Sequence, residues 1–434
     1  MNYFSYDIKK HNYIQFSSFQ PKATPGFWRL LWRKWKNWWK YGRKVSNVEL
    51  PKTKAVLFVS TTQNNKRALE PIWKNLPEDS YTAITRENIN EFMPNALVAK
   101  YSFRYLIPLL KAYISSTKHE KAIIRSYFDF FFSVMGDLKL VERLLKNNPI
   151  SLVVMANDHS PIQRSFIAVA KELGTKTLYV QHCSVTERFP ELKFTYSLLD
   201  GEESFEKYAK IGGMEGTVYL CGNPRFDYIR TLSGKKEALK RIGIALNLND
   251  NMERVFELCA VLKENGFEDI VIRPHPRHNI DLGKFEENGF EISDSKKENP
   301  FEFLIHINYL IAGESGIHLD AAMMETPSVC YAFSDDRSTF DWYSYIKNGL
   351  MPFTENPAEV VEIIKKTWGE DAGRRIDFLR WYNASLGTPQ DGHIGELVAD
   401  FIVHQQKDRI EDFDEKYNFK KTRLLDKEVK VYNC

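Results

Sequence analysis

Apolar and polar positions follow, along most of the chain, the periods of an α/β protein. From Lys54 onward, short apolar runs of strand length alternate with stretches whose apolar residues recur every three or four positions, as in buried strands and amphipathic helices. The pattern predicts strands at Ala55 to Ser60, Ser151 to Ala156, Thr177 to Val180, Thr217 to Leu220, Ile242 to Ala245, Ile270 to Arg273, Tyr309 to Ala312 and Ser328 to Tyr331. It predicts helices at about 98–116, 121–146, 162–173, 251–265 and 316–324, then a helical last third and a charged, poorly patterned stretch over 405–434.

The best-defined unit lies between residues 151 and 180. Ser160 and Pro161 suit the N-cap and the first position of a helix, and Gly174 suits its end. An apolar strand precedes this helix and another follows it. The segment therefore predicts a βαβ unit of a parallel sheet.

The segment from Phe27 to Lys44 combines tryptophans with cations. Apolar residues recur at three- and four-residue steps, at Trp28, Leu31, Trp32, Trp35, Trp38 and Trp39. The gaps hold Arg29, Arg33, Lys34, Lys36, Lys40, Arg43 and Lys44. Because indole rings favour lipid headgroups and cations favour anionic lipid, we expect a helix in the membrane interface, contacting it through Trp28, Trp32, Trp35 and Trp39. The alternative is a helix packed on the protein by its tryptophans.

The length of the chain indicates two domains. Its 434 residues, 43% of them apolar, exceed the ~250 residues at which single domains usually stop growing. We expect an N-terminal region over 1–50 with the tryptophan helix, an α/β domain over 51–215, a second over 216–370, and C-terminal helices with a charged tail over 371–434. A cleft between the two α/β domains is the expected place for a ligand.

Charge and cysteine content exclude several classes of protein. The formal net charge is only +3, from 60 basic and 57 acidic residues, so we expect no nucleic-acid partner. Five scattered cysteines show neither zinc-site spacing nor disulfide density, which favours a reducing, cytoplasmic setting. Without a signal-like or membrane-spanning stretch, we expect a cytoplasmic protein peripheral on the inner face of the cell membrane.

Polar residues follow several predicted strands. In open parallel sheets ligands bind beyond the carboxyl ends of the strands, where helix N-termini also point. The residues at these ends are Asn157, Asp158 and His159; Gln181 and His182; Pro274, His275, Pro276 and Arg277; and Gly313, Glu314, Ser315 and Gly316.

The turn from Gly313 to Gly316 is the strongest phosphate candidate. Its glycines let the backbone approach a ligand, the helix that follows presents N–H groups, and Ser315 adds a hydroxyl. We expect Glu314, Ser315 and Gly316 at the phosphate, and Asp320, one turn on, at the ribose. The alternative is an ordinary strand-to-helix turn with a capping serine.

The run Arg273-Pro274-His275-Pro276-Arg277 holds one histidine between two prolines. The prolines fix the backbone, so the imidazole of His275 would have a set orientation for phosphate binding or leaving-group protonation. Arg273, Pro276 and Arg277 are candidate neighbours of the same phosphate. The alternative is a structural histidine.

Two further turns supply candidates. Asn223 and Arg225, in Asn223-Pro224-Arg225, follow another strand and can line the cleft, or form a plain turn into a helix. Asp158 precedes a helix N-terminus and can act as a general base or as a nucleophile. The alternative is that Asp158 or Ser160 merely caps that helix, and His182 is the rival base.

In combination, these segments resemble the GT-B superfamily, in particular bacterial CDP-glycerol glycerophosphotransferases, polysialyltransferases and Kdo transferases of capsule, lipopolysaccharide and cell-wall synthesis. The resemblance covers about residues 150–332 and rests on four motifs in the family's order. They are Gln181-His182, Gly222-Asn223-Pro224-Arg225-Phe226-Asp227, His275-Pro276, and the run from Glu314 to Ala321 that leads to Pro327-Ser328-Val329.

The resemblance implies an α/β fold of two Rossmann-like domains facing a central cleft. It implies donor phosphate at His275 and Ser315, ribose or base at Asp320, an acidic base in the N-terminal domain, and no essential metal or cofactor beyond the nucleotide-activated donor. The expected reaction moves a sugar or polyol phosphate from a CMP- or CDP-linked donor to a surface-polysaccharide or lipid-linked acceptor. Cys183 and Gly316 depart from the family's usual glycine and serine, which leaves the donor open.

Other interpretations stay open from the residues. Non-hydrolysing UDP-GlcNAc 2-epimerases share the fold and a similar turn, so a nucleotide-sugar epimerase is the rival enzyme. A membrane-associated scaffold with a decayed transferase fold is the non-enzyme alternative. The triplet Asp412-Phe413-Asp414 looks like a metal-binding motif, but it lies in the charged tail and is expected to be solvated surface.

Overall fold

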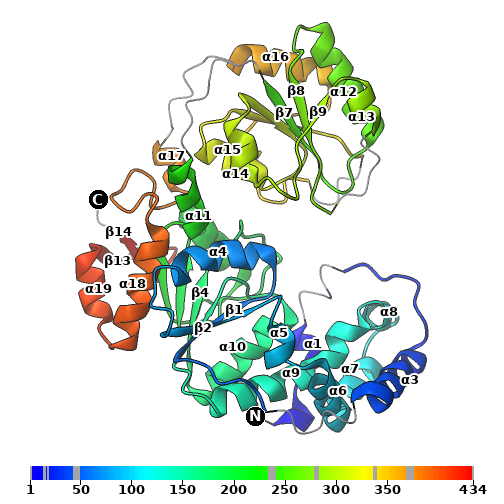
Figure 1. The fold of residues 1–434 in the computed structure, drawn as a ribbon, viewed down its shortest axis with the longest axis vertical. Coiled ribbons are helices and arrows are strands. Elements are labelled where there is room, and N and C mark those ends of the chain that lie inside the picture. The colour runs from blue at the N-terminus through cyan, green and yellow to red at the C-terminus, as the bar shows by residue number, and fades with distance from the viewer. Residues whose placement is uncertain are drawn as a thin grey trace. The chain divides into compact units, whose positions relative to one another are not determined.

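The computed structural model describes residues 2–12, 16, 19–42, 49–232, 241–277, 283–335, 340–367 and 376–432. The chain divides into two compact units (Figure 1): unit 1 comprises Met1–Arg225 and Tyr382–Cys434, and unit 2 comprises Phe226–Trp381. Each unit has its own largely parallel sheet with helices packed against it, which confirms the predicted α/β class.

The sheet of unit 1 has the strand order β13-β14-β6-β5-β4-β3-β1-β2, parallel except between β13 and β14. Its central strands are buried along their whole length, as β1 and β3 are, because helices cover parallel sheets on both faces. The strands are β1 (Val56–Ser60), β2 (Tyr81–Thr85), β3 (Leu152–Met155), β4 (Lys176–Val180), β5 (Tyr196–Leu199), β6 (Thr217–Leu220), β13 (Phe419–Leu424) and β14 (Lys427–Tyr432).

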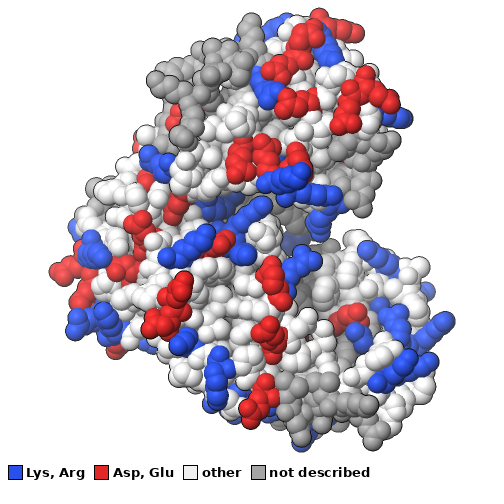
Figure 2. All heavy atoms as spheres, viewed as in Figure 1, with Lys and Arg blue, Asp and Glu red and all other residues white. Residues whose placement is uncertain are grey.

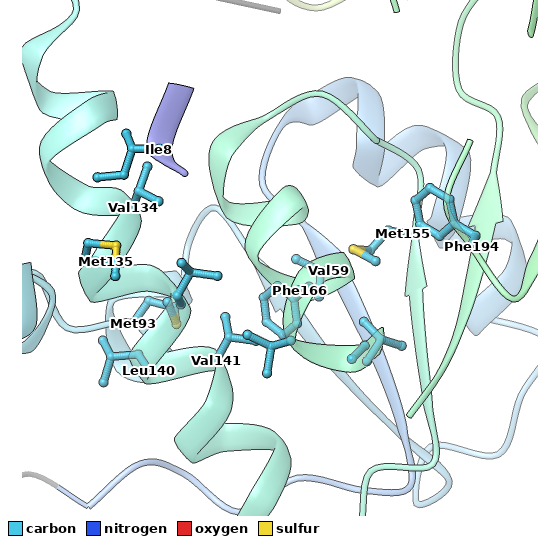
Figure 3. Packing of buried hydrophobic residues seen from close by; sticks show 14 of the residues in the cluster. Ile8, Val59, Met93, Val134, Met135, Leu140, Val141, Met155, Phe166 and Phe194 are labelled. Atoms are coloured by element: carbon cyan, nitrogen blue, oxygen red, sulfur yellow. The ribbon is translucent and has the colours of Figure 1, made fainter. Parts of the chain in front are cut away.

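A cluster of helices next to this sheet is built around the long helix α9. Figure 3 shows Val141 of α9 near Phe166 of α10, while Ile8 from the N-terminal segment lies against the start of α9. The helices of unit 1 are α1 (Ile8–His11), α3 (Phe27–Asn37), α4 (Gln63–Trp73), α5 (Ile89–Phe92), α6 (Asn95–Arg104), α7 (Ile107–Ile114), α8 (Lys118–Ser126), α9 (Phe128–Lys146), α10 (Pro161–Leu173), α11 (Glu202–Ile211), α18 (Ile394–Gln406) and α19 (Ile410–Lys416). Short turns η1 (Tyr3–Ser5) and η2 (Trp38–Gly42, a π-helix) flank α1 and α3.

Unit 2 is a smaller layer structure with the strand order β12-β11-β10-β7-β8-β9, parallel at every pairing in the described residues. Its strands are β7 (Ile242–Ala245), β8 (Ile270–Arg273), β9 (Glu291–Ile292), β10 (Tyr309–Ala312), β11 (Ser328–Tyr331) and β12 (Phe353–Thr354). Its helices are α12 (Met252–Glu264), α13 (Gly283–Glu287), α14 (Pro300–Ile305), α15 (Ile317–Met323), α16 (Pro357–Thr367) and α17 (Ile376–Arg380), and η4 (Pro224–Thr231) leads into the unit.

The boundaries of the units differ from the predicted boundaries at 215/216 and 370/371. The boundary expected at 215/216 places β6 in the second domain, but β6 pairs with β5 and β14 in the sheet of unit 1. The chain also returns to unit 1 at Tyr382. The predicted boundaries miss this return because it depends on pairing between residues about two hundred positions apart in the sequence.

The stretch predicted as a charged tail is an ordered part of unit 1. Within it, β13 and β14 form an antiparallel hairpin on the edge of the sheet. The supposed metal-binding triplet lies in α19: Phe413 is fully buried, and Asp414 accepts a hydrogen bond from the Tyr219 hydroxyl at 2.9 Å and pairs with Lys430. This part of the triplet is therefore structural rather than solvated surface.

Two predicted long helices are each broken. The stretch 98–116 divides into α6 and α7, with Pro108 near the start of α7, where proline is tolerated. The stretch 121–146 lies in α8 and α9 with the break at Tyr127. The tryptophan helix is α3 followed by η2, which ends at Gly42; Arg43 and Lys44 lie outside the described residues. Within the described chain, every helix is too short or too polar to cross a bilayer.

Candidate functional site

A cavity of about 280 Å³ opens in unit 2 at the carboxyl ends of its strands. Its polar wall comes from the turn after β7, the end of β8 and the turn after β10, and its apolar wall from the end of β11 and from β12. The lining residues are Asn247, Leu248, Asn249, Asp250, His275, Gly313, Glu314, Cys330, Tyr331, Ala332, Phe333, Ser334 and Phe353. The volume lies just below the ~300–1,000 Å³ usual for ligand pockets.

The turn after β10 is held by side chains from two directions. Asn247 Nδ2 donates to the Glu314 carbonyl at 3.0 Å. Below the turn, the ring of His318 is fully buried, with Nε2 3.0 Å from the Gly313 carbonyl and Nδ1 3.0 Å from Ser328 Oγ. Nε2 is therefore the protonated nitrogen and Nδ1 accepts from the serine, which fixes the tautomer. The sequence did not single out His318, although it lies in the same turn-and-helix motif.

His275 lines the cavity, as predicted, and its orientation is set by its own turn. The backbone N–H of Arg277 donates to His275 Nδ1 at 3.2 Å. A neutral ring that accepts at Nδ1 carries its proton on Nε2. Nε2 is then the donor nitrogen of the ring.

Of the other predicted residues of unit 2, some line the cavity and others do not. Glu314 lines the cavity, and its carboxylate accepts from the backbone N–H of Asp341. Ser315 and Gly316 follow at the start of α15, where Ser315 Oγ accepts from the N–H of Ile317 at 3.4 Å. Asp320 is 5% exposed and is not among the described residues that line the cavity, so the expected ribose contact has no support from its position.

Arg273 has a structural role instead of the predicted phosphate contact. Its buried guanidinium donates to Ser293 Oγ at 2.8 Å and to the Glu298 carboxylate and carbonyl at 3.0 and 2.7 Å. These bonds tie the end of β8 to the segment before α14. Pro276 and Arg277 are exposed on the turn.

In unit 1, a buried polar cluster occupies the ends of β3 and β4. Asp158 is 1% exposed; its carboxylate accepts from the Tyr208 hydroxyl at 2.7 Å and pairs with His159 Nδ1 at 3.0 Å. His159 is the more accessible member, with 30% of its side chain exposed. Because Nδ1 faces the carboxylate, Nε2 carries the lone pair of the neutral ring. This is the arrangement of an oriented general base.

Neither Asp158 nor Ser160 caps α10 through its side chain, and the turn that precedes the helix is held by Asn157. Its Oδ1 accepts from the backbone N–H groups of His159 and Ser160, both at 2.9 Å. Ser160 occupies the N-cap position of α10 without a side-chain bond to the helix. The Asp158 carboxylate is thereby directed to His159 rather than to the helix.

His182, the rival base, lies beside His159 with ring centroids 6.2 Å apart. Burial, together with the neighbouring His159 and Arg225, lowers the pKa of His182 to about 4, although Asp158 opposes the shift. Burial likewise raises the pKa of the Cys183 thiol to about 12. At neutral pH both are uncharged, and His182 is a weaker base than its ordinary pKa implies.

A hydrogen-bonded group lies next to this cluster and consists of Gln181, Asp200 and Asn223. Asn223 Nδ2 donates to the Gln181 carbonyl and to Asp200 Oδ1, both at 3.0 Å, while its Oδ1 accepts from the N–H of Arg225 at 3.0 Å. Asn223 thus directs its amide into the protein rather than toward a nucleotide. The last residue of unit 1, Arg225, lies close enough to affect the pKa values of Asp200 and His182.

Asp200 is a buried carboxyl that the sequence did not single out. Burial raises its pKa to about 8, although Arg225 and the bond from Asn223 lower it. The group is therefore mostly protonated at neutral pH. Its position after β5 is the kind of strand-end signal that could have identified it, but β5 itself was not predicted.

Neither a family model nor a curated protein sequence matches the chain. Solved structures do. A structure of the wall teichoic acid polymerase TagF soaked with CDPG matches 88% of this chain and 98% of its own at 15% identity and a TM-score of 0.51. UDP-GlcNAc 2-epimerase from Methanocaldococcus jannaschii matches 80% and 99% at 12% identity and a TM-score of 0.50. The S. aureus MnaA–UDP co-structure matches 82% and 97% at 11% identity and a TM-score of 0.51.

The chain has the GT-B fold. Identities of 11–15% establish this architecture and nothing finer. The GT-B architecture confirms the predicted pair of Rossmann-like domains. Polymerase and epimerase both occur among the similar structures, so the choice between them rests on the residues of this chain.

Proposed function

We propose that the chain is a glycosyltransferase that moves a sugar or polyol phosphate from a CMP- or CDP-linked donor to a surface-polysaccharide or lipid-linked acceptor. The cavity of unit 2 carries the proposal, because it combines a histidine of fixed tautomer with an apolar, aromatic wall at the carboxyl ends of parallel strands. Similar GT-B structures were determined with UDP and with CDPG, which supports a nucleotide-linked donor for this chain.

The donor is assigned to unit 2. We assign the nucleoside to the wall formed by Tyr331, Phe333 and Phe353, and the phosphate to the wall formed by His275 and the turn after β10. His275 Nε2–H would donate to the phosphate that departs with the nucleotide and stabilise its developing charge. Ser315, Gly316 and Arg277 adjoin this wall and remain proposed phosphate contacts, whereas Arg273 and Asp320 are left out.

Proton removal from the acceptor hydroxyl is assigned to unit 1. His159 Nε2 would take the proton, and Asp158 would hold the ring and stabilise the imidazolium that forms. This replaces the expectation that Asp158 or His182 is itself the base. The proposed reaction needs no metal ion or further cofactor, and we expect turnover to persist in EDTA.

The nucleotide preference is tested by thermal unfolding with CMP, CDP, UDP and GDP. A ligand that binds the folded state raises the unfolding temperature by mass action, and we expect the cytidine nucleotides to raise it most. His275→Ala should remove the shift seen with CDP, whereas His306→Ala, an exposed histidine of unit 2, should keep it. Lack of any shift in the wild-type protein would favour a non-catalytic scaffold.

The rival enzyme is a UDP-GlcNAc 2-epimerase, supported by the epimerase among the similar structures. An epimerase needs no acceptor. Incubation with UDP-GlcNAc alone, followed by chromatography of the nucleotide sugars, therefore separates the two. Formation of the 2-epimer would contradict the transferase proposal.

A further inference from the structure

The face of α3 that bears the tryptophans is not the face that packs on the protein. Phe27 and Leu30 are 2% and 4% exposed, and the Phe27 ring stacks on Tyr113 of α7 at 4.0 Å and meets Phe128 of α9 edge-on at 5.5 Å. These two residues hold the helix in place. The exposed tryptophans are therefore not the residues that attach α3 to the rest of unit 1.

Four indole rings of this segment lie at the surface. Trp28 and Trp32 are 66% and 60% exposed, and Trp39 and Trp35 are 48% and 36% exposed. Trp35 stacks on Trp32 at 4.9 Å and on Trp39 at 5.4 Å, so these three rings form a ladder along the helix. Large apolar side chains gathered in this way mark an interaction surface.

The charged residues of α3 and η2 are all basic. Arg29, Arg33, Lys36 and Lys40 are exposed, and between residues 8 and 48 the sequence contains neither Asp nor Glu. Figure 2 shows Lys and Arg side chains gathered at the lower right, where Figure 1 draws α3. Lys34, on the inner side, pairs instead with Asp129 at 2.9 Å.

We propose that the face of α3 and η2 formed by Trp28, Trp32, Trp35 and Trp39, with Arg29, Arg33 and Lys36, docks onto the surface of an anionic phospholipid bilayer. Indole rings settle at the level of the headgroups, and flanking cations are drawn to anionic lipid. α3 has 11 residues and η2 has 5, together fewer than the ~20 needed to cross a bilayer, so the segment lies in the plane of the interface. This inference does not depend on the proposed reaction.

The test is co-sedimentation of the full chain with vesicles of phosphatidylcholine alone and of phosphatidylcholine mixed with phosphatidylglycerol, without nucleotide. We expect binding to the anionic vesicles, with a blue shift of tryptophan fluorescence, and weaker binding as salt is added. Binding that is absent, or equal on both kinds of vesicle, would overturn the proposal.

Two variants separate the contributions of the indoles and the cations. Trp28→Ala, Trp32→Ala and Trp35→Ala together should abolish binding and the blue shift. Arg29→Gln, Arg33→Gln and Lys36→Gln together should weaken binding to anionic vesicles about a hundredfold, given the attraction of each cation near the membrane surface. Circular dichroism and thermal unfolding check that both variants are folded.

The matched control removes three cations from elsewhere in unit 1. Lys420→Gln, Lys421→Gln and Arg423→Gln change exposed residues of β13 and the same net charge, and should bind vesicles as the wild type does. If this control lost as much binding as the α3 charge variant, the attraction would be nonspecific and the proposal wrong. A tryptophan variant that kept vesicle binding but lost self-association in analytical ultracentrifugation would likewise overturn it, in favour of a contact between copies of the chain.

Discussion

At the scale of single residues, the contact between Asp158 and His159 decides which side chain of unit 1 can take a proton. The carboxylate is buried and bound by Tyr208, whereas the imidazole beside it is partly exposed. Asn157, Asp158 and His159 all follow the same strand in the sequence. Their position alone therefore does not distinguish a residue that caps the helix from a residue that acts as a base. Only the geometry shows that the asparagine holds the turn before the helix and that the aspartate orients the histidine.

Replacement of Asp158 by asparagine should stop transfer and leave donor binding intact. The amide can donate to His159 Nδ1, which would place the proton on Nε2 and remove the lone pair from the reacting side. We expect kcat to fall by about a hundredfold or more, the usual contribution of a general base, with KM for the donor unchanged. His159→Gln should give a similar loss.

The matched control for Asp158→Asn is Asp200→Asn. Burial keeps the Asp200 carboxyl mostly protonated at neutral pH, so the amide replaces a neutral group of the same shape. We expect turnover near that of the wild type. An Asp158→Asn enzyme as active as this control would show that the dyad has no catalytic role.

The buried ring of His318 predicts a pH dependence of stability. Burial lowers its pKa from 6.5 to about 4, so the unfolded chain takes up this proton near pH 6.5 and the folded chain only near pH 4. The stability due to the neutral ring is thus present above pH 6.5 and lost as the pH falls toward 4. The His318→Gln variant has no titratable side chain at this position, so its stability does not change with this protonation. Its deficit in unfolding free energy relative to the wild type should therefore shrink by about 3 kcal/mol across this range.

Urea unfolding at several pH values measures this difference directly. A deficit that is constant with pH would mean that His318 is not held neutral by its surroundings. The same variant should also weaken the thermal shift by CDP, because His318 positions the turn after β10.

At the scale of elements, the contact between α6 and α9 depends on one glycine. A Cβ added at Gly136 would lie 2.2 Å from the carbonyl oxygen of Val98 and 2.7 Å from its carbonyl carbon. These are backbone atoms, which cannot move without displacing α6. The helix therefore needs glycine here, although alanine is the better helix former by about 1 kcal/mol.

Gly136→Ala should accordingly destabilise unit 1. The cost of overpacking, about 1–3 kcal/mol, exceeds the gain in helix propensity, so we expect a lower midpoint in chemical unfolding. Gly213→Ala is the control, since no atom lies within 4 Å of the added methyl group there. Equal midpoints for both variants would contradict the close approach of the two helices.

The elements also show which parts of a fold can be predicted from one sequence. The βαβ unit at 151–180 is found as expected, with Pro161 at the start of α10 and Gly174 left-handed at its end, because local signals fix both ends. The hairpin β13–β14 was missed because exposed lysines and arginines on β13 conceal its alternation, and because its partner β6 is far away in the sequence.

At the scale of the whole molecule, the fold class followed from the alternation of strands and helices, and the similar structures confirm it. The candidate site followed only in part. His275 and Glu314 do reach the cavity, since strand ends are predictable from sequence. The sequence predicts ligand contacts for Arg273, Asn223 and Asp320. In the structure Arg273 contacts Glu298, Asn223 contacts Asp200, and Asp320 is buried in α15. Partners that are distant in the sequence cannot be seen in a linear pattern.

The return of the chain to unit 1 at Tyr382 has a consequence for synthesis on the ribosome. Unit 2 is one uninterrupted segment, so it can fold as soon as it has been translated, in the order usual for nascent chains. Unit 1 cannot be completed then, because β14 is made about two hundred residues after β6, the strand with which it pairs. Until β14 emerges, the apolar strand β6 is an unpaired edge of the sheet and is prone to aggregation. We expect chaperones to bind the growing protein mainly during this interval.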